Sequence, residues 1–260
     1  MTTRDHAPAG SPCWADLFTS DVAGSRRFYA GLFGWQANEP QAEFGGYFTF
    51  SRHGVPVSGA MGDMGDVKAT DSWQIYLAAG DVAKTVEAAE AGGARVISPA
   101  MAVADLGTQA ILVDPTGAQV GAWQADTFAG FTTLGEHGAP SWFELHTRDY
   151  ARAIAFYPSV FGLDTATLSD SDDFRYTTLC PPGGGEVAGI MDAGGFMPEG
   201  AASHWEVYWE VDDVDTSVAT LESLGGSVVV PAEDTPYGRI AKVADPAGAH
   251  FRLRSGPSSS

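Results

Sequence analysis

The chain has 260 residues, which fits one large domain or two small ones, and 44% of them are hydrophobic, as in ordinary globular proteins. Its 33 acidic and 14 basic residues give a net charge of −19, which argues against binding to nucleic acids or anionic membranes. No apolar run is long enough to cross a bilayer and the N-terminus lacks a secretory signal, so we expect a cytoplasmic protein.

The first half is predicted to contain two successive units, each with a strand, a helix and further strands. Asp21 is a residue type that caps the start of a helix, and Gly34 is one that ends it. Apolar residues at helical spacing between them support that helix. The expected elements, in chain order, are a strand at 15–19, a helix from Asp21 to Gly34, strands at 47–54 and 55–61, a strand from Trp73, a helix at 82–91, and strands at 94–101, 108–114 and 118–124.

The second half repeats the first. DVAGSRRFYAGLFGW from Asp21 matches DYARAIAFYPSVFGL from Asp149, and the strand motifs CWADLFTSD and SWFELHTRD precede them. WQIYLAAGDV matches WEVYWEVDDV, and LVDPTGAQV matches VADPAGAHF, in the same order. We therefore expect two homologous domains, at residues 10–125 and 139–256, joined by a linker at 126–138. The last six residues, SGPSSS, are expected to be disordered.

These motifs resemble the vicinal-oxygen-chelate superfamily, the glyoxalase, bleomycin-resistance and dioxygenase proteins. The resemblance rests on FYAGLFGW and FYPSVFGL, on DVDTSVATLESLGGSV, and on DPTGAQV and DPAGAHF. It covers nearly the whole chain. It implies an α+β fold in which each domain pairs two βαβββ modules, whose curved mixed sheet encloses a cup. Many members hold a divalent metal in this cup, and others bind drugs without a metal.

The resemblance also indicates where metal ligands would stand, at the first and last strands of the modules. These positions hold Trp14, Gln74 and Gly121 in the first half, and Trp142, Glu206 and Arg252 in the second. None is a histidine, and one carboxylate beside an arginine makes a poor metal site. We therefore expect no metal and no other cofactor, which puts glyoxalase I and extradiol dioxygenase activity in doubt. A metal bound by an unusual set, Glu144, His146 and His250, is the alternative.

Alternation along the strands predicts which side chains face each cup. The first cup combines aromatic rings with an acid and two amides, and the second holds more ionisable groups. Aromatic rings with a few polar groups are typical of sites for organic ligands. The expected set is Trp14, Asp16, Phe18, Gln74, Tyr76, Gln119 and Trp123 in the first cup, and Trp142, Glu144, His146, Glu206, Tyr208, Glu210, His250, Arg252 and Arg254 in the second.

From this set we predict catalytic roles for Glu144, Glu206, Tyr208, His250 and Arg252. Ligand binding is predicted for Trp14, Asp16, Phe18, Gln74, Tyr76, Gln119, Trp123, Trp142 and His146.

Most of these residues also have a structural interpretation. Asp16 and Glu144 either accept N–H groups or act as general bases with raised pKa values, because burying an unpaired acid is costly. Glu206 and Arg252 could be only a buried ion pair. His146 is expected on a solvated rim and His204 at the surface.

Three functions stay open. The first is a metal-independent enzyme that moves protons next to a carbonyl, of isomerase, cyclase or lyase type. The second is a binding protein that sequesters an aromatic drug or antibiotic, and the third is a metal-dependent glyoxalase or dioxygenase. The partner in each case is a small organic molecule rather than nucleic acid or membrane. Four modules already supply two complete cups, so a monomer or a homodimer is expected.

Overall fold

The computed structural model describes residues 2–256, and it contains the predicted four modules. Each module is one strand, one helix and three strands, so the predicted α+β architecture of two repeated domains, each with two βαβββ modules in one mixed sheet, is confirmed. Of the six C-terminal residues expected to be disordered, 257–260 lie outside the described residues, and Ser255 ends the last strand. In residues 2–256 no helix combines the length and apolarity needed to cross a bilayer.

The first half folds into one eight-stranded sheet, in the order β3-β4-β5-β2-β6-β9-β8-β7. Its two modules meet where β2 pairs antiparallel with β6. Their elements are β2 (Pro12–Phe18), α1 (Val22–Phe33), β3 (Gln36–Ala37), β4 (Phe48–Arg52) and β5 (Val55–Met61), then β6 (Ser72–Ala78), α2 (Val82–Ala91), β7 (Arg95–Val103), β8 (Gly107–Val113) and β9 (Gln119–Ala125). A short 3-10 helix, η1 (Ala42–Phe44), precedes β4.

The second half repeats this sheet in the order β12-β13-β14-β11-β15-β18-β17-β16. Its modules meet at the antiparallel pair β11 and β15. Their elements are β11 (Pro140–Thr147), α3 (Tyr150–Phe161), β12 (Asp164–Asp170), β13 (Arg175–Cys180) and β14 (Ala188–Asp192), then β15 (His204–Glu210), α4 (Val214–Ser223), β16 (Ser227–Thr235), β17 (Gly238–Ala244) and β18 (His250–Ser255). Before it, β10 (Thr133–Leu134) pairs with β1 (Thr2–Thr3).

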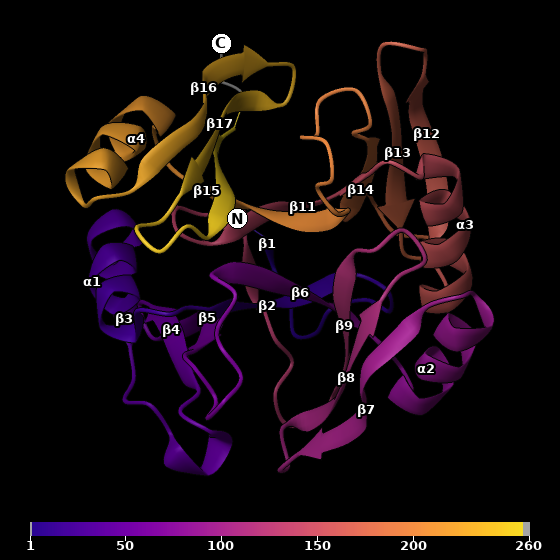
Figure 1. The fold of residues 1–260 in the computed structure, drawn as a ribbon, viewed down its shortest axis with the longest axis horizontal. Helices are drawn as coiled ribbons and strands as arrows, with labels where there is room; N and C mark the ends of the chain where they lie inside the picture. Colours follow the sequence, from indigo (N-terminus) through magenta and orange to yellow (C-terminus); the bar gives the residue numbers. More distant parts are fainter. Residues whose placement is uncertain (1, 257–260) are drawn as a thin grey trace.

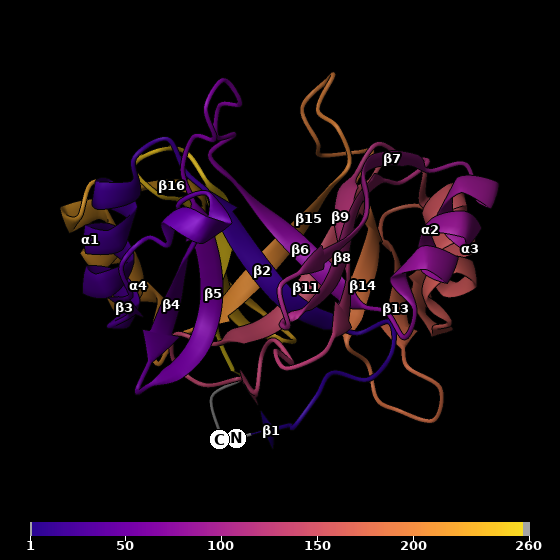
Figure 2. The same ribbon diagram turned by 90° about the horizontal axis from the view of Figure 1, so that it is seen from below.

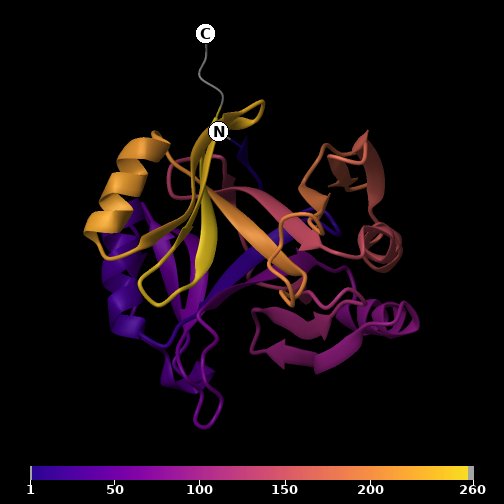
Figure 3. The ribbon, with the colours of Figure 1, turned by 45° about the horizontal axis from the view of Figure 1, so that its top comes forward.

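The two halves pack side by side through their helices. Figure 1 shows α1 beside α4 at one flank and α2 beside α3 at the other, and both pairs are in contact. The strands lie between these flanks (Figure 2), and the indigo and magenta first half lies against the orange and yellow second half (Figure 3). The first helix of each half therefore packs against the second helix of the other half.

Each of the four α-helices in residues 2–256 begins after an aspartate N-cap. The side chains of Asp21, Asp81, Asp149 and Asp213 each accept a backbone N–H from three residues further on. Such N-caps satisfy donors that the first helical turn leaves unpaired. Asp21 was predicted as a cap, and Gly34 ends the same helix in the left-handed conformation that glycine tolerates best.

Strand alternation separates the core from the cups. On β2, Ala15 and Leu17 are fully buried, while Trp14 and Asp16 lie on the opposite face of the sheet. The core continues across both halves, where Trp35 and Trp73 pack on Trp209. We call the sheet face around Asp16 the first cup and the equivalent face around Glu144 the second cup.

Two reciprocal hydrogen bonds join the halves. Tyr29 on α1 donates to Asp245 at 3.0 Å, and Tyr157 on α3 donates to Asp114 at 2.7 Å. Each aspartate opens a DP-x-GA turn and also accepts the backbone N–H groups that shape that turn. The repeated FY and DP motifs therefore meet in space, each from the opposite half.

Candidate functional site

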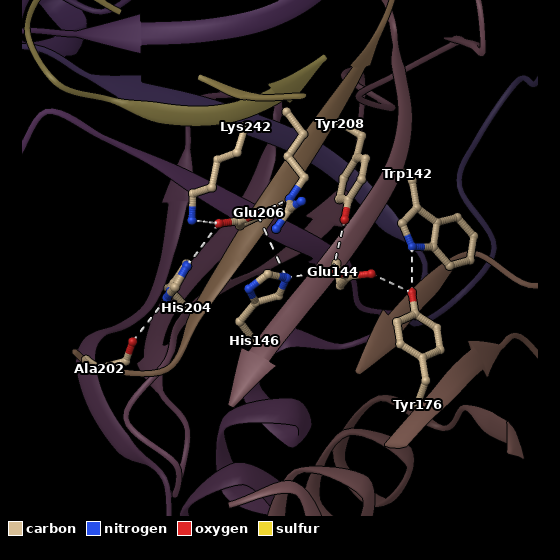
Figure 4. A network of polar contacts seen from close by, with 10 residues as sticks. Trp142, Glu144, His146, Tyr176, Ala202, His204, Glu206, Tyr208 and Lys242 are labelled. Carbon is tan, nitrogen blue, oxygen red and sulfur yellow. Dashed lines mark hydrogen bonds and ion pairs between the residues drawn. The ribbon is translucent and has the colours of Figure 1, made fainter. Parts of the chain in front are cut away.

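Glu144 lies at the floor of the second cup and accepts three hydrogen bonds. It stands near the middle of β11, and its side chain is buried. Oε1 lies 2.6 Å from His146 Nε2 and accepts from the Tyr208 hydroxyl at 2.9 Å. Oε2 accepts from Tyr176 at 2.7 Å, and Tyr176 in turn accepts from Trp142 Nε1 at 2.9 Å (Figure 4). The acid is thus paired with an imidazole and two phenols.

Glu206 lies across from Glu144 on β15, in the register that pairs the two strands. Its carboxylate is buried and bound by two cations, Lys242 at Oε1 and Arg252 at Oε2. His204 Nε2 also reaches Oε1 at 3.2 Å. The ion pair with Arg252 considered from the sequence is present, and Lys242 adds a second positive charge.

The partners of these two carboxyls together shift their pKa values more than burial does. Burial alone would raise the pKa of Glu144, but the hydrogen bond and charge of His146 and the charge of Arg252 outweigh it and lower that pKa. The pKa of Glu206 is also raised by burial and then lowered well below its usual range by His204, His146, Arg252 and Lys242. The expectation of a raised pKa is therefore wrong for Glu144, and both carboxyls are ionised at neutral pH.

Two histidines differ from their expected places. His146, predicted on a solvated rim, is 1% exposed, because Phe196 from the segment between β14 and β15 covers its ring at 5.6 Å between centroids. His204, predicted at the surface, is the first residue of β15 and is half-buried beside Glu206. The end of β11 and the start of β15 lie side by side, with His146 directly opposite His204.

His146, His204 and Glu206 place one donor atom each within 4.8 Å of one another, so they could surround a divalent ion. This differs from the set considered from the sequence, Glu144, His146 and His250. The donors fit such an ion poorly, because Lys242 and Arg252 already bind the Glu206 carboxylate. A divalent ion there would lie beside two positive groups and compete with both.

The remaining predicted residues of the second cup lie further from this centre. His250 is exposed at the start of β18 and makes no hydrogen bond with the cluster in the described part of the chain. Burial and the charge of Lys242 lower its pKa. The ring of Tyr208 packs under the Arg252 guanidinium at 5.3 Å. Glu210 and Arg254 bond to the backbone near the C-terminal end, at Gly256 and Tyr237, and so do not join the site.

The first cup contains an acid without a cation. Asp16 Oδ1 accepts from Trp14 Nε1 at 2.9 Å and from the Tyr47 hydroxyl at 2.9 Å. Burial raises the pKa of Asp16 to about 6, although hydrogen bonds from Tyr47, Tyr76 and Trp14 oppose the shift. Here the sequence-based expectation of a raised pKa agrees with the structure. The tryptophan N–H that was expected from across the pair of domains comes instead from Trp14 on the same strand.

Other predicted residues of the first cup serve packing. Phe128, from the segment between the halves, packs edge-on against Trp14 at 4.7 Å and accepts a hydrogen bond from Trp123 through its backbone oxygen. Gln119 donates to Gln74 at 2.5 Å, so the two amides bind each other. Phe18 lies at the end of β2, opposite Ser72. This half therefore offers one acid, Asp16, among side chains that already have partners.

Three residues at these sites escaped the sequence analysis. Tyr47 and Tyr176 bind the floor acids of the two cups, and both occur in a Tyr-x-Thr pattern, YFT and YTT. Lys242 lies on β17, where Ala241 and Val243 are fully buried, so alternation on GRIAKVA points Lys242 the other way. Alternation along these middle strands is the sequence signal that could have found these residues.

Strand registers align the two cups residue by residue. In the first half Asp16 pairs with Gln74, and Phe18 pairs with Ser72. At the equivalent positions of the second half Glu144 pairs with Glu206, and His146 pairs with His204. Further along the first sheet, Gly121 lies between Tyr76 and Ile111 on the neighbouring strands. In the second sheet, Arg252 lies in the same way between Tyr208 and Lys242. Both cups thus share an acid, a tryptophan and two tyrosines, and the second cup alone adds histidines, Glu206 and two cations.

Comparison with known proteins agrees with this architecture. The profile of the Glyoxalase/Bleomycin resistance protein/Dioxygenase superfamily matches residues 139–253, and that of a glyoxalase-like domain matches residues 14–121.

Two curated relatives align over nearly the full chain. "Putative glyoxylase CFP32" of Mycobacterium bovis is 36% identical over 97% of both chains. "Anthracycline biosynthesis protein DnrV" of Streptomyces peucetius is 35% identical over 94% of this chain and 92% of its own.

Solved structures share the fold at low identity. The Mn(II)-bound glyoxalase from Novosphingobium aromaticivorans has a TM-score of 0.65 at 18% identity and covers 95% of this chain and 82% of its own. The 2,3-dioxygenase LapB from Pseudomonas sp. KL28 has a TM-score of 0.64 at 15% identity, covering 96% and 93%. With two matching domains and relatives aligned end to end, the chain belongs to the glyoxalase, bleomycin-resistance and dioxygenase superfamily.

Proposed function

We propose that the second cup is the active site of a metal-independent enzyme that transfers protons next to a carbonyl of a small organic molecule, in an isomerase, cyclase or lyase reaction. The observation that carries this proposal is the buried Glu144–His146 pair beside Glu206 and its two cations. An acid–imidazole pair moves protons, and cations stabilise the negative charge that develops on a carbonyl oxygen.

His146 is the proton carrier in this proposal. Glu144 is ionised and lies 2.6 Å from Nε2, so it fixes the ring and stabilises the imidazolium formed when His146 takes a proton. Tyr176 and Tyr208 donate to Glu144, and burial followed by the Glu144 charge raises the pKa of both phenols, so they stay protonated donors. Arg252 and Lys242 supply the positive charge that stabilises negative charge on the substrate's oxygen atoms. This differs from our first assignment, which placed His146 in binding and His250 in catalysis.

No step in this proposal uses a metal, because Glu206, the one carboxylate among the three residues that could hold it, already binds two cations. The names of the relatives support an organic metabolite as substrate: one is called a glyoxylase, and another is named for anthracycline biosynthesis. The other side of the cup, at His204 and His250, is the more exposed one, and we place the substrate entrance there.

Exchange of carbon-bound hydrogen tests the proposal without knowledge of the full reaction. The purified protein is incubated in D₂O with a panel of 2-oxo acids, methyl ketones and aromatic ketones, and deuterium incorporation is followed by NMR. We expect catalysed exchange in at least one compound class. Replacing Glu144 with Gln, or His146 with Asn, should slow it at least about 100-fold, the range typical of general acid–base catalysis.

The duplicated acid provides the matched control. Asp16→Asn makes the same chemical change in the first cup, and we expect it to slow exchange less than about tenfold. Unchanged exchange in Glu144→Gln and Glu206→Gln variants would contradict the proposal, and a larger loss in Asp16→Asn would assign the chemistry to the first cup. A ligand that binds and is recovered unaltered after long incubation would instead support a binding protein.

A further inference from the structure

Basic side chains gather around one carboxylate of the second cup. Lys242 and Arg252 contact different oxygens of Glu206, and they are direct cross-strand partners on β17 and β18. His204 reaches the same carboxylate, and His250 lies at the start of β18. Two full positive charges thus contact one carboxylate, in a chain whose net charge is −19. The charge of the second buried carboxylate, Glu144, also acts on Arg252.

Arg252 still has donors to offer. Its Nε binds Glu206, whereas its two terminal nitrogens make no hydrogen bond within residues 2–256. A guanidinium has five N–H donors in a planar fork, whose terminal edge matches the two oxygens of a carboxylate. The side chains of Arg252 and Lys242 keep 18% and 14% of their surface exposed, so both can meet a molecule that enters the cup.

The first cup lacks this arrangement. Gly121 stands at the position of Arg252 and Ile111 at that of Lys242, while the acid, the tryptophan and the two tyrosines are present in both cups. The fold therefore forms without the two cations. Their presence in the second cup calls for another reason, and the terminal edge of Arg252, which makes no hydrogen bond in the described residues, points to a ligand.

We propose that Arg252 and Lys242 form a subsite for a carboxylate, and that the substrate of the second cup is a carboxylic acid. The fork of Arg252 takes both oxygens, and the Lys242 ammonium approaches one of them. The Glu144–His146 pair then meets the carbon next to that group. The reaction of the bound carboxylic acid rests on the proposed function, whereas the binding of its carboxylate by Arg252 and Lys242 does not.

Paired probes test the subsite. Benzoate and benzamide have nearly the same shape and differ in charge, and calorimetric titration at low ionic strength, in Tris–chloride without phosphate, compares their affinities. We expect benzoate to bind at least about tenfold more tightly than benzamide, a typical gain from charge-assisted hydrogen bonds. Arg252→Gln and Lys242→Met should each reduce this preference several-fold. Arg252→Lys, which keeps the charge without the fork, should retain only part of it.

Arg239→Gln is the matched control. It also removes one positive charge, but Arg239 pairs with Asp215 and Asp234 outside the cup, so the preference should persist. Far-ultraviolet circular dichroism shows that each variant is folded. Equal affinities for benzoate and benzamide, no binding of either, or a preference unchanged in both cup variants would overturn the subsite. Glu144→Gln separates the two proposals: it should abolish hydrogen exchange and keep the preference for benzoate.

Discussion

Replacing Asp16 with Asn should stabilise the protein at neutral pH, although the change removes a buried side chain's charge. Asp16 is 7% exposed, and no cation contacts it in the described residues. Burial raises its pKa from 3.8 to about 6, so the ionised form is less favourable in the folded protein than in the unfolded chain. Asparagine keeps an oxygen that accepts from Trp14 and Tyr47 without this penalty.

The size and sign of the effect follow from linkage. Each pKa unit corresponds to about 1.4 kcal/mol, so the ionised acid costs about 3 kcal/mol of unfolding free energy at pH 7. Between pH 4 and 6 the folded state binds more protons than the unfolded state, so stability falls as pH rises through this window. The Asp16→Asn variant should match the wild type near pH 4 and exceed it by about 5–10 °C in melting temperature at pH 7.

Differential scanning calorimetry at pH 4, 5, 6 and 7 measures this difference directly. Glu144→Gln is the internal control, because the pKa of Glu144 is lowered and the sign reverses. That carboxylate stabilises the fold above its unfolded pKa, and the contribution disappears as the pH falls, so the Glu144→Gln variant should be the less stable protein at pH 7. An Asp16→Asn variant that is no more stable than the wild type at pH 7 would refute the reasoning, since Asp16 would then have a stabilising partner when ionised.

Three further outcomes are expected. Tyr29→Phe and Tyr157→Phe each remove a hydrogen bond to an aspartate of the opposite half and should lower the unfolding free energy by about 1.5–3 kcal/mol in urea titrations; losses under about 0.5 kcal/mol would mean that these bonds do not join the halves. Glu206→Gln leaves Lys242 and Arg252 without a counter-charge and should cost about 3–5 kcal/mol in the same assay, so a neutral result would contradict the buried ion-pair description. Elemental analysis of untagged protein, purified without chelator or added metal, should find well under one divalent ion per chain, whereas near-stoichiometric metal would show that the two cations do not keep an ion out.

The fold could be predicted because its sequence motifs occur in both halves of the chain. Repeated motifs set the boundaries of the modules, and alternation separated Ala15 and Leu17 from Trp14 and Asp16 without structural information. Both signals are local: a strand shows its two faces, and an aspartate before an apolar stripe shows where a helix begins. Because these signals agree between the two halves, the architecture could be predicted even where a single element, such as the short β3, gave no signal.

The site was only partly predictable, because its environment comes from distant segments. His146 stands near the end of its strand, where a solvated rim is the natural expectation, and it is buried by Phe196, which lies 50 residues further along the chain on a segment with no regular structure. Trp14 and Trp123 were predicted to face the first cup, but both are buried in the core, where Phe128 of the connecting segment packs against one and bonds to the other. Alternation gives the direction of a side chain and not what covers it.

The two floor acids show most clearly what residue type leaves undetermined. Asp16 and Glu144 occupy equivalent positions, and each has a tryptophan and two tyrosines around it, yet burial raises the pKa of one while partners lower that of the other. The difference lies in positions opposite and beside them, where His146 and Arg252 replace Phe18 and Gly121. The residues that both cups share therefore explain how the fold holds a buried acid. The residues that differ between the two cups would explain any chemistry at the second cup. Comparing the halves of this one chain, variant by variant, separates these two contributions more cleanly than comparing different proteins, because fold, solvent and concentration are the same for both cups.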